Sequence, residues 1–191
     1  MATRSGERKN QILQVLAEML QAPKSEKITT AALAARLDVS EAALYRHFAS
    51  KAQMYEGLIG FVEETVFGLI NKISAEQESG LKQTHAIAAM LLSFAEKNPG
   101  MTRVLIGDAL VNEDERLQLR INQLHDRLEA TLKQSLRLAA TQGEIDKDSE
   151  VPAQANLMLA FIIGRWHQYA KSGFKRPPTE LWQKQGPMLL G

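Results

Sequence analysis

Residues 28–51 read ITTAALAARLDVSEAALYRHFASK, and they encode two short helices, a tight turn between them and the start of a third helix. Thr29 or Thr30 caps the first helix, because its hydroxyl accepts a hydrogen bond from an unpaired backbone N–H of the first turn. Asp38 falls where that helix ends in a sharp turn, which requires left-handed backbone angles that Asp tolerates better than most residues. Ser40 caps the next helix. The spacing predicts a helix-turn-helix.

The second of these helices has one buried side and one open side. Val39, Leu44 and Phe48 are spaced to bury it against a scaffold. The rest of its surface carries Glu41, Ala42, Ala43, Tyr45, Arg46 and His47. Such a face suits insertion into the major groove of DNA, with phosphate contacts around it. The alternative is a helical hairpin with a solvated face and no nucleic-acid role.

We expect two kinds of DNA contact from this segment. The residues expected nearest the base edges are Ser40, Ala42 and Ala43. The residues expected mainly at phosphates are Thr29, Tyr45, His47 and Lys51. Alanine methyl groups are suited to contact with thymine methyl groups in the major groove.

The segment from Thr30 to Lys51 resembles the DNA-binding signature of the TetR family of bacterial regulators. The hallmark of that family is Tyr-x-His-Phe at the end of the recognition helix, followed by a lysine. In this chain these residues are Tyr45, His47, Phe48 and Lys51. The resemblance implies an all-α, TetR-like fold. A three-helix DNA-binding head would occupy residues 1–52, and a helical body for dimerisation and partner binding would occupy residues 53–191.

The rest of the chain also has helical periodicity, and no strand pattern competes with it. Long helices are predicted over residues 8–21, 50–73, 81–97 and 115–140. The sequence Asn98-Pro99-Gly100 should end the third of these, because proline disfavours helical geometry in the residue before it. Thr102 is expected to cap a short helix that reaches about residue 110. Pro152 falls near the first turn of a further helix, where proline is tolerated.

Residues 157–164, LMLAFIIG, are apolar around the whole helix and therefore predict burial on every side. We expect a second subunit to provide part of that burial, and the core of a monomer is the alternative. The TetR resemblance implies that the last two long helices of each subunit form a four-helix dimer interface. The candidate interface residues are Leu159, Ile163, Trp166 and Trp182.

Composition excludes several other classes of protein. The 191 residues contain no cysteine, which removes disulfides, thiolate metal sites and cysteine nucleophiles. The chain has no phosphate-binding glycine loop and no nucleophile motif, and no two of its histidines lie three or four residues apart, so we expect no catalytic residue, cofactor or metal. The formal net charge is +1, with a modest excess of basic residues up to Lys51. Without an apolar membrane-crossing run or a signal peptide, we expect a cytoplasmic protein.

Further segments resemble the nucleoid occlusion members of the TetR family. These segments are MLQAPKSEKITT, KNPGMTRVLIGDAL and ERLQLRINQLHDRLEATL. The resemblance implies a dimer that binds palindromic chromosomal sites in the nucleoid and engages the C-terminal tail of the division protein FtsZ. The matching positions for the FtsZ tail are Phe61, Met90, Ser93, Lys97 and Asn98, in a groove between the helices at 50–73 and 81–97. The alternative for Phe61 and Met90 is a place in the core. A TetR-type repressor released by a small-molecule ligand is the alternative function.

Overall fold

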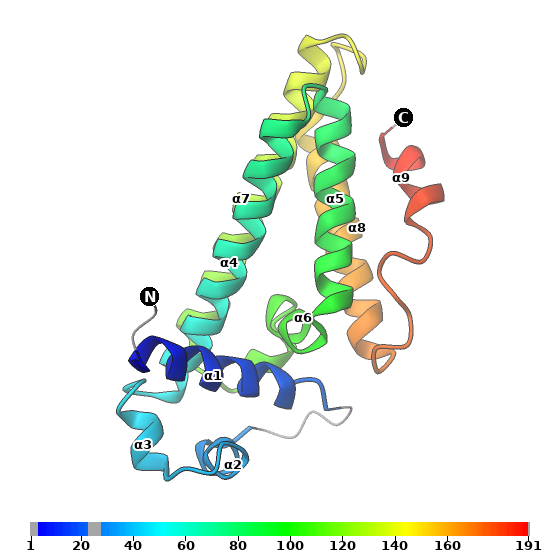
Figure 1. The fold of residues 1–191 in the computed structure, drawn as a ribbon. Helices are drawn as coiled ribbons and strands as arrows, with labels where there is room; N and C mark the ends of the chain where they lie inside the picture. Colours follow the sequence, from blue (N-terminus) through cyan, green and yellow to red (C-terminus); the bar gives the residue numbers. More distant parts are fainter. Residues whose placement is uncertain (1–3, 23–27, 191) are drawn as a thin grey trace. The chain divides into compact units, whose positions relative to one another are not determined.

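The computed structural model describes residues 4–22 and 28–190, and this part of the chain is helical without any strand (Figure 1). Its elements are α1 (Arg4–Met19), α2 (Thr30–Arg36), α3 (Glu41–Tyr45), α4 (Lys51–Glu76), α5 (Gly80–Lys97), α6 (Pro99–Leu105), the 3₁₀ turn η1 (Asp108–Leu110), α7 (Glu115–Thr141), α8 (Val151–Lys171) and α9 (Trp182–Leu190). The all-α prediction is confirmed. No helix in the described part is long and apolar enough to cross a membrane.

The chain divides into two compact units. The first unit contains the residues up to Val62 together with Pro99–Ile121, and the second contains Glu63–Asn98 with the residues from Asn122 onward. Both α4 and α7 begin in the first unit and continue into the second. The segment predicted as the DNA-binding head therefore shares its unit with α6, η1 and the first turns of α7. The domain boundary at residue 52 stays a prediction.

The caps predicted for the helix-turn-helix are present. The Thr29 hydroxyl accepts a hydrogen bond from the backbone N–H of Ala32 at 3.1 Å. The Ser40 hydroxyl accepts one from the N–H of Ala43 at 3.2 Å. Asp38 has the expected positive φ, 54°. The turn between α2 and α3 is thus fixed by local contacts, as the sequence indicated.

The first unit is built around apolar side chains of the three head helices and the start of α4. Its buried residues include Ile12, Leu16, Leu33, Leu44, Phe48, Met54, Tyr55 and Leu58. Helix α6 packs directly on the backbone of α1 at Gly100, where an added Cβ would lie 1.9 Å from the Ala17 carbonyl oxygen. Only glycine allows this approach.

Arg103 on α6 joins the end of α1 to η1. Its Nη1 donates hydrogen bonds to the carbonyl oxygens of Leu20 at 3.3 Å and Ala22 at 3.2 Å. Its Nε donates to Asp108 Oδ2 at 2.9 Å. Carbonyls at the end of a helix lack hydrogen-bond partners within the helix, and Arg103 donates the missing hydrogen bonds here. The charge of Arg103 is in turn neutralised by Asp108.

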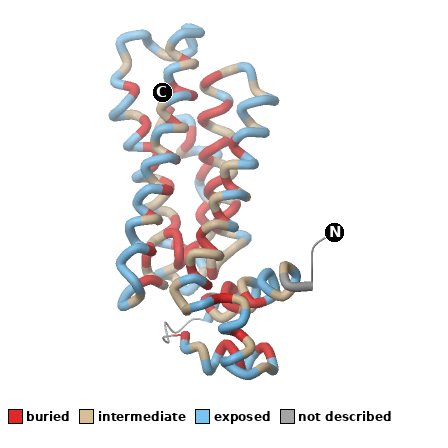
Figure 2. Tube along the Cα trace, turned by 90° about the vertical axis from the view of Figure 1, so that its left-hand side faces the viewer, coloured by how far each residue is buried: buried red, intermediate tan, exposed pale blue. Residues whose placement is uncertain are grey.

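In the second unit, α5 packs beside α8, and α9 lies against both. Buried and exposed positions alternate along these helices, as expected for amphipathic elements (Figure 2). Trp166 is 0% exposed, and its Nε1 donates a hydrogen bond to the carbonyl of Leu91 at 3.2 Å. The Tyr169 hydroxyl donates to the Glu96 carbonyl at 3.0 Å. Each of these aromatic residues thus connects α8 to α5.

Two predictions about elements need correction. Thr102 does not cap a helix, because α6 begins at Pro99, whose fixed φ and missing N–H suit a first helical position, and Thr102 is buried within it. The segment after residue 181 forms α9, which the pattern did not indicate because Pro187 lies inside it. Within residues 157–164, Leu157 is 55% exposed in the single chain, so the predicted burial of this segment by a second subunit stays a prediction.

Candidate nucleic-acid and partner interfaces

The candidate recognition helix is α3, a helix of five residues held in place by Leu44 and Phe48. These side chains are 1% and 7% exposed. On the opposite side Ser40, Ala42 and Tyr45 are exposed, and Ala43 and His47 are half-buried. The predicted base-contacting residues therefore lie at the start of α3, which is the end that reaches base edges when such a helix enters the major groove.

A chain of hydrogen bonds connects α2 to α3 on the exposed side. The Tyr45 hydroxyl donates to Thr30 Oγ1 at 3.5 Å, and Thr30 Oγ1 donates to Glu41 Oε2 at 2.6 Å. Tyr45 is 45% exposed, so its ring remains accessible while its hydroxyl is oriented. Sequence reasoning considered Thr30 only as an alternative helix cap and did not pair it with Glu41, because the contact joins residues eleven positions apart in two helices.

Lys51, a predicted phosphate contact, is engaged by a carboxylate of its own unit. Its Nζ lies 2.5 Å from Glu113 Oε1, and the two side chains are 19% and 11% exposed. The same Nζ lies 5.6 Å from the centre of the Tyr55 ring. Burial and the negative charge of Glu113 hold the pKa of the Tyr55 hydroxyl well above its usual value, and Arg103 lowers it only in part. Glu113 is 62 residues from Lys51, so no sequence pattern could have paired them.

The residues predicted to contact the FtsZ tail are distributed over both units. Phe61 belongs to the first unit and is 49% exposed, so the alternative that places it in the core is wrong. Met90 and Ser93 are half-buried on α5, and Lys97 is exposed in its last turn. Residues three or four positions apart share one face of a helix, so these three belong to one face of α5.

Asn98 caps the end of α5 rather than lying on its open face. Its Nδ2 donates to the Phe94 carbonyl at 2.7 Å. This contact satisfies one of the carbonyls that a helix leaves unpaired at its end. The groove and the role of these residues in binding the FtsZ tail stay predictions.

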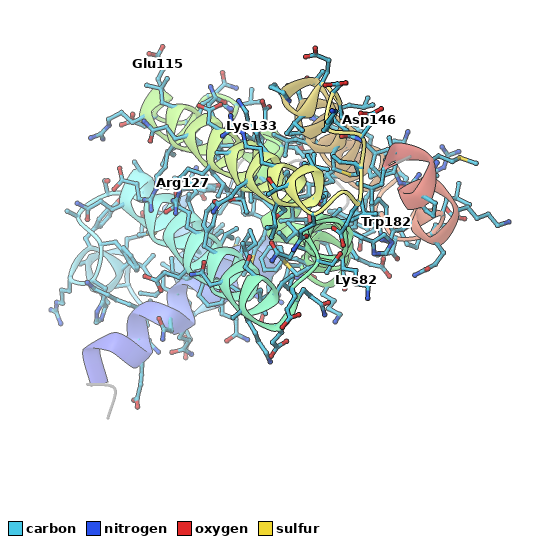
Figure 3. All side chains as sticks on the ribbon, turned by 90° about the horizontal axis from the view of Figure 1, so that it is seen from above. Lys82, Glu115, Arg127, Lys133, Asp146 and Trp182 are labelled. Carbon is cyan, nitrogen blue, oxygen red and sulfur yellow. The ribbon has the colours of Figure 1, made fainter. Side chains whose placement is uncertain are left out.

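The predicted dimer-interface side chains are mostly buried within their own subunit. Leu159, Trp166 and Trp182 are 5%, 0% and 3% exposed, and Ile163 is half-buried. Trp182, at the start of α9 in Figure 3, has its ring centre 4.9 Å from that of His85 and 6.1 Å from that of Phe161. Leu159, Trp166 and Trp182 therefore pack inside their own subunit and have almost no surface left for contact with a second subunit.

The predicted set of dimer-interface residues therefore needs correction, because the exposed positions of α8 lie on its outer face. That face presents Leu157, Ala160 and Gly164, spaced by three and four residues. An added Cβ at Gly164 would meet no atom within 4 Å, so the helix is open there in the single chain. The interface itself stays a prediction.

Helix α7 is fixed beside its neighbours in the second unit by two polar contacts. The Arg127 guanidinium lies 3.9 Å above the Phe67 ring, on the side of α7 that faces α4 (Figure 3). Glu129 Oε2 accepts a hydrogen bond from the Asn156 amide of α8 at 2.9 Å. Within the described residues, no group of three or more His, Asp or Glu side chains could hold a metal ion.

Comparison with known proteins identifies a family for most of the chain. Residues 12–58 match the family described as bacterial regulatory proteins, tetR family, and residues 76–191 match the tetracyclin repressor-like C-terminal domain of the SlmA-like group. A protein of Marinomonas sp. (strain MWYL1) named nucleoid occlusion factor SlmA is 46% identical over 99% of this chain and 96% of its own length. A protein of the same name from Idiomarina loihiensis is 48% identical with the same coverage.

A solved structure shows the same fold at lower identity. The MbdR regulator from Azoarcus sp. CIB has a TM-score of 0.80 and 16% identity, covering 95% of this chain and 96% of its own. At this identity the likeness establishes the fold and nothing further.

Proposed function

The chain belongs to the TetR family of bacterial regulatory proteins, within the group of nucleoid occlusion factors named SlmA, and we propose that it binds DNA as a dimer and blocks cell division over the nucleoid. The observation that supports the DNA-binding part most directly is the pair of capped helices α2 and α3, with the start of α3 exposed. Such an arrangement is rigid enough to read a groove and small enough to enter it.

In the proposed complex, the start of α3 lies in the major groove. Ser40, Ala42 and Ala43 face the base edges there, with the alanine methyl groups suited to thymine. Hydroxyl and basic groups around the helix contact phosphates, which position the protein without reading sequence. These groups are Thr29, Tyr45, His47 and Lys51.

We propose that two copies associate through the outer face of α8, next to α7. A two-fold dimer presents two recognition helices, which read half-sites about 34 to 36 Å apart or at a multiple of this spacing. Leu157 supplies apolar area on this face, and Gly164 allows a close approach between helices. The pairing of two heads compensates for the modest net charge of +1.

We further propose that the protein binds the C-terminal tail of FtsZ while it is bound to DNA in the nucleoid. The contacts that carry this proposal lie around α5 in the second unit, and they are Met90, Ser93, Lys97 and Asn98. Phe61, on α4 in the first unit, stays a separate candidate contact. Apolar side chains would supply most of the affinity, because an exposed ion pair contributes only about 0 to 1 kcal/mol. Such binding follows the general mode in which a peptide is held by apolar helix surfaces.

The experiment that tests this function combines two measurements. Chromosomal fragments bound by the purified protein are sequenced, and a labelled FtsZ tail peptide is titrated into the DNA-bound protein. Sites spread over the chromosome, together with peptide binding, are expected. A single site beside one gene, with no peptide binding, would instead indicate a ligand-responsive repressor.

A further inference from the structure

The ion pair between Lys51 and Glu113 places a carboxylate at the lysine that is assigned to DNA phosphate. The two charged atoms are 2.5 Å apart, and both side chains are largely shielded from water. A lysine ammonium is a compact charge on a flexible stem, so it interacts with whichever anion is nearest. Phosphate and Glu113 therefore compete for the same group.

Glu113 is held at this place by the backbone around it. Its N–H donates to the Leu110 carbonyl at 2.9 Å, and the preceding Asn112 has a positive φ of 66°. The segment that carries it is anchored just past the end of α1 through Arg103, which binds Asp108 on one side and the carbonyls of Leu20 and Ala22 on the other. Glu113 therefore stays near the start of α4.

Lys51 differs from its partner in freedom of movement. Its backbone is fixed as the first residue of α4 behind Ser50, whose hydroxyl accepts from the Gln53 N–H at 3.2 Å. The long lysine side chain is flexible, so the ammonium can turn from Glu113 toward a phosphate without any change in the helix. Turning away leaves the Glu113 carboxylate shielded from water without its partner, so this exchange costs part of the free energy that the phosphate contact supplies.

We propose that Glu113 is an internal competitor of the DNA backbone for Lys51 and thereby sets the strength and salt dependence of DNA binding. The proposal rests on the DNA-binding function proposed above. In wild-type protein, Lys51 can bind a DNA phosphate only after its pair with Glu113 breaks, or with the phosphate placed beside the Glu113 carboxylate. Either event lowers affinity for all DNA sequences alike, since phosphates carry no sequence information.

The test compares Glu113→Gln with a neighbouring variant that removes the same charge. Asp114 is the matched control, because its carboxylate binds Arg116 at the surface at 2.7 Å and not Lys51. DNA affinity of wild type, Glu113→Gln and Asp114→Asn is measured over a series of salt concentrations. Glu113→Gln should bind specific and unrelated DNA about three- to tenfold more tightly at low salt, and its salt slope should steepen by about one unit per head. Asp114→Asn should change the slope much less.

A second pair of variants tests whether the effect passes through Lys51. In a Lys51→Ala background, Glu113→Gln should change DNA affinity and the salt slope no more than Asp114→Asn does. Should Glu113→Gln fail to fold, Glu113→Ala is the second variant. In wild type, the carboxyl ¹³C resonance of Glu113 should shift on DNA addition while that of Asp108 does not.

Two results are distinguishable. If wild type binds DNA and Glu113→Gln behaves like Asp114→Asn, or the Glu113 resonance stays unchanged, the competition is refuted and DNA binding stands. If neither wild type nor Glu113→Gln binds any DNA, the proposed function itself fails, and the competition fails with it.

Discussion

Thr30 donates a 2.6 Å hydrogen bond to Glu41, and this contact ties the start of α2 to the start of the recognition helix. Because Thr30 also accepts from the Tyr45 hydroxyl, one threonine orients both an acid and an aromatic residue on the side that we propose faces DNA. The rigidity of the proposed DNA-binding surface therefore depends on a residue that need not touch the bases.

Replacing Thr30 with valine should weaken DNA binding several-fold, because the Tyr45 hydroxyl and the Glu41 carboxylate lose their common partner. The shape of the side chain is kept, and each of the two lost hydrogen bonds costs only about 0.5 to 1.5 kcal/mol of stability. Electrophoretic mobility shifts and thermal melting of the same samples check this. A variant that binds DNA as wild type does would show that the network has no role in recognition.

Lys51→Ala should lower affinity for all DNA sequences by a similar factor, and it should reduce the salt slope by about one unit per head in the Glu113→Gln background, where no carboxylate competes for the lysine, and by less in wild type. The reason is that a phosphate contact releases counterions but reads no base. The measurement is a salt series on specific and unrelated fragments. A changed sequence preference with an unchanged salt slope would contradict the assignment.

Gly100→Ala should destabilise the first unit strongly, because the new Cβ would lie 1.9 Å from the Ala17 carbonyl oxygen and α6 would have to move. Gly68→Ala is the matched control, since no atom lies within 4 Å of its added Cβ in the interior of α4. This control should stabilise by about 0.5 to 1 kcal/mol, the helix preference of alanine over glycine. Chemical denaturation compares the two. Equal effects would mean that α6 does not pack tightly on α1.

Leu157→Asp should produce monomers, because it places a charge in the proposed seam between subunits. Met188→Asp is the control: it changes a residue that is 81% exposed on α9 and should leave the dimer intact. Analytical ultracentrifugation measures both, and the monomeric variant should also bind palindromic DNA far more weakly. If wild type is a monomer at micromolar concentration and still binds palindromes tightly, the interface is wrong.

The sequence was sufficient to predict the local contacts of the helix-turn-helix segment. A cap and the N–H that it binds lie within three residues of each other, as Thr29 with Ala32 and Ser40 with Ala43, so a short pattern reports them. The apolar spacing of Leu44 and Phe48 likewise identified the buried side of α3.

Long-range contacts were beyond such patterns. Neither Lys51 with Glu113 nor Arg103 with the end of α1 leaves a periodic signal, because each joins distant segments through single side chains. Apolar periodicity also reports that a residue is buried without indicating which subunit buries it. For this reason Trp166 was assigned to a dimer contact although its own subunit encloses it.

The central claim is that one protein binds DNA and the FtsZ tail through separate surfaces, and a peptide titration tests it most directly. A labelled FtsZ C-terminal tail peptide is added to DNA-bound wild type and to DNA-bound Met90→Glu, with fluorescence anisotropy as the readout. The peptide should bind wild type. Met90→Glu should no longer bind the peptide, because the new charge lies on the face of α5 assigned to it, but this variant should keep its affinity for DNA. No peptide binding to folded, DNA-bound wild type would contradict the account.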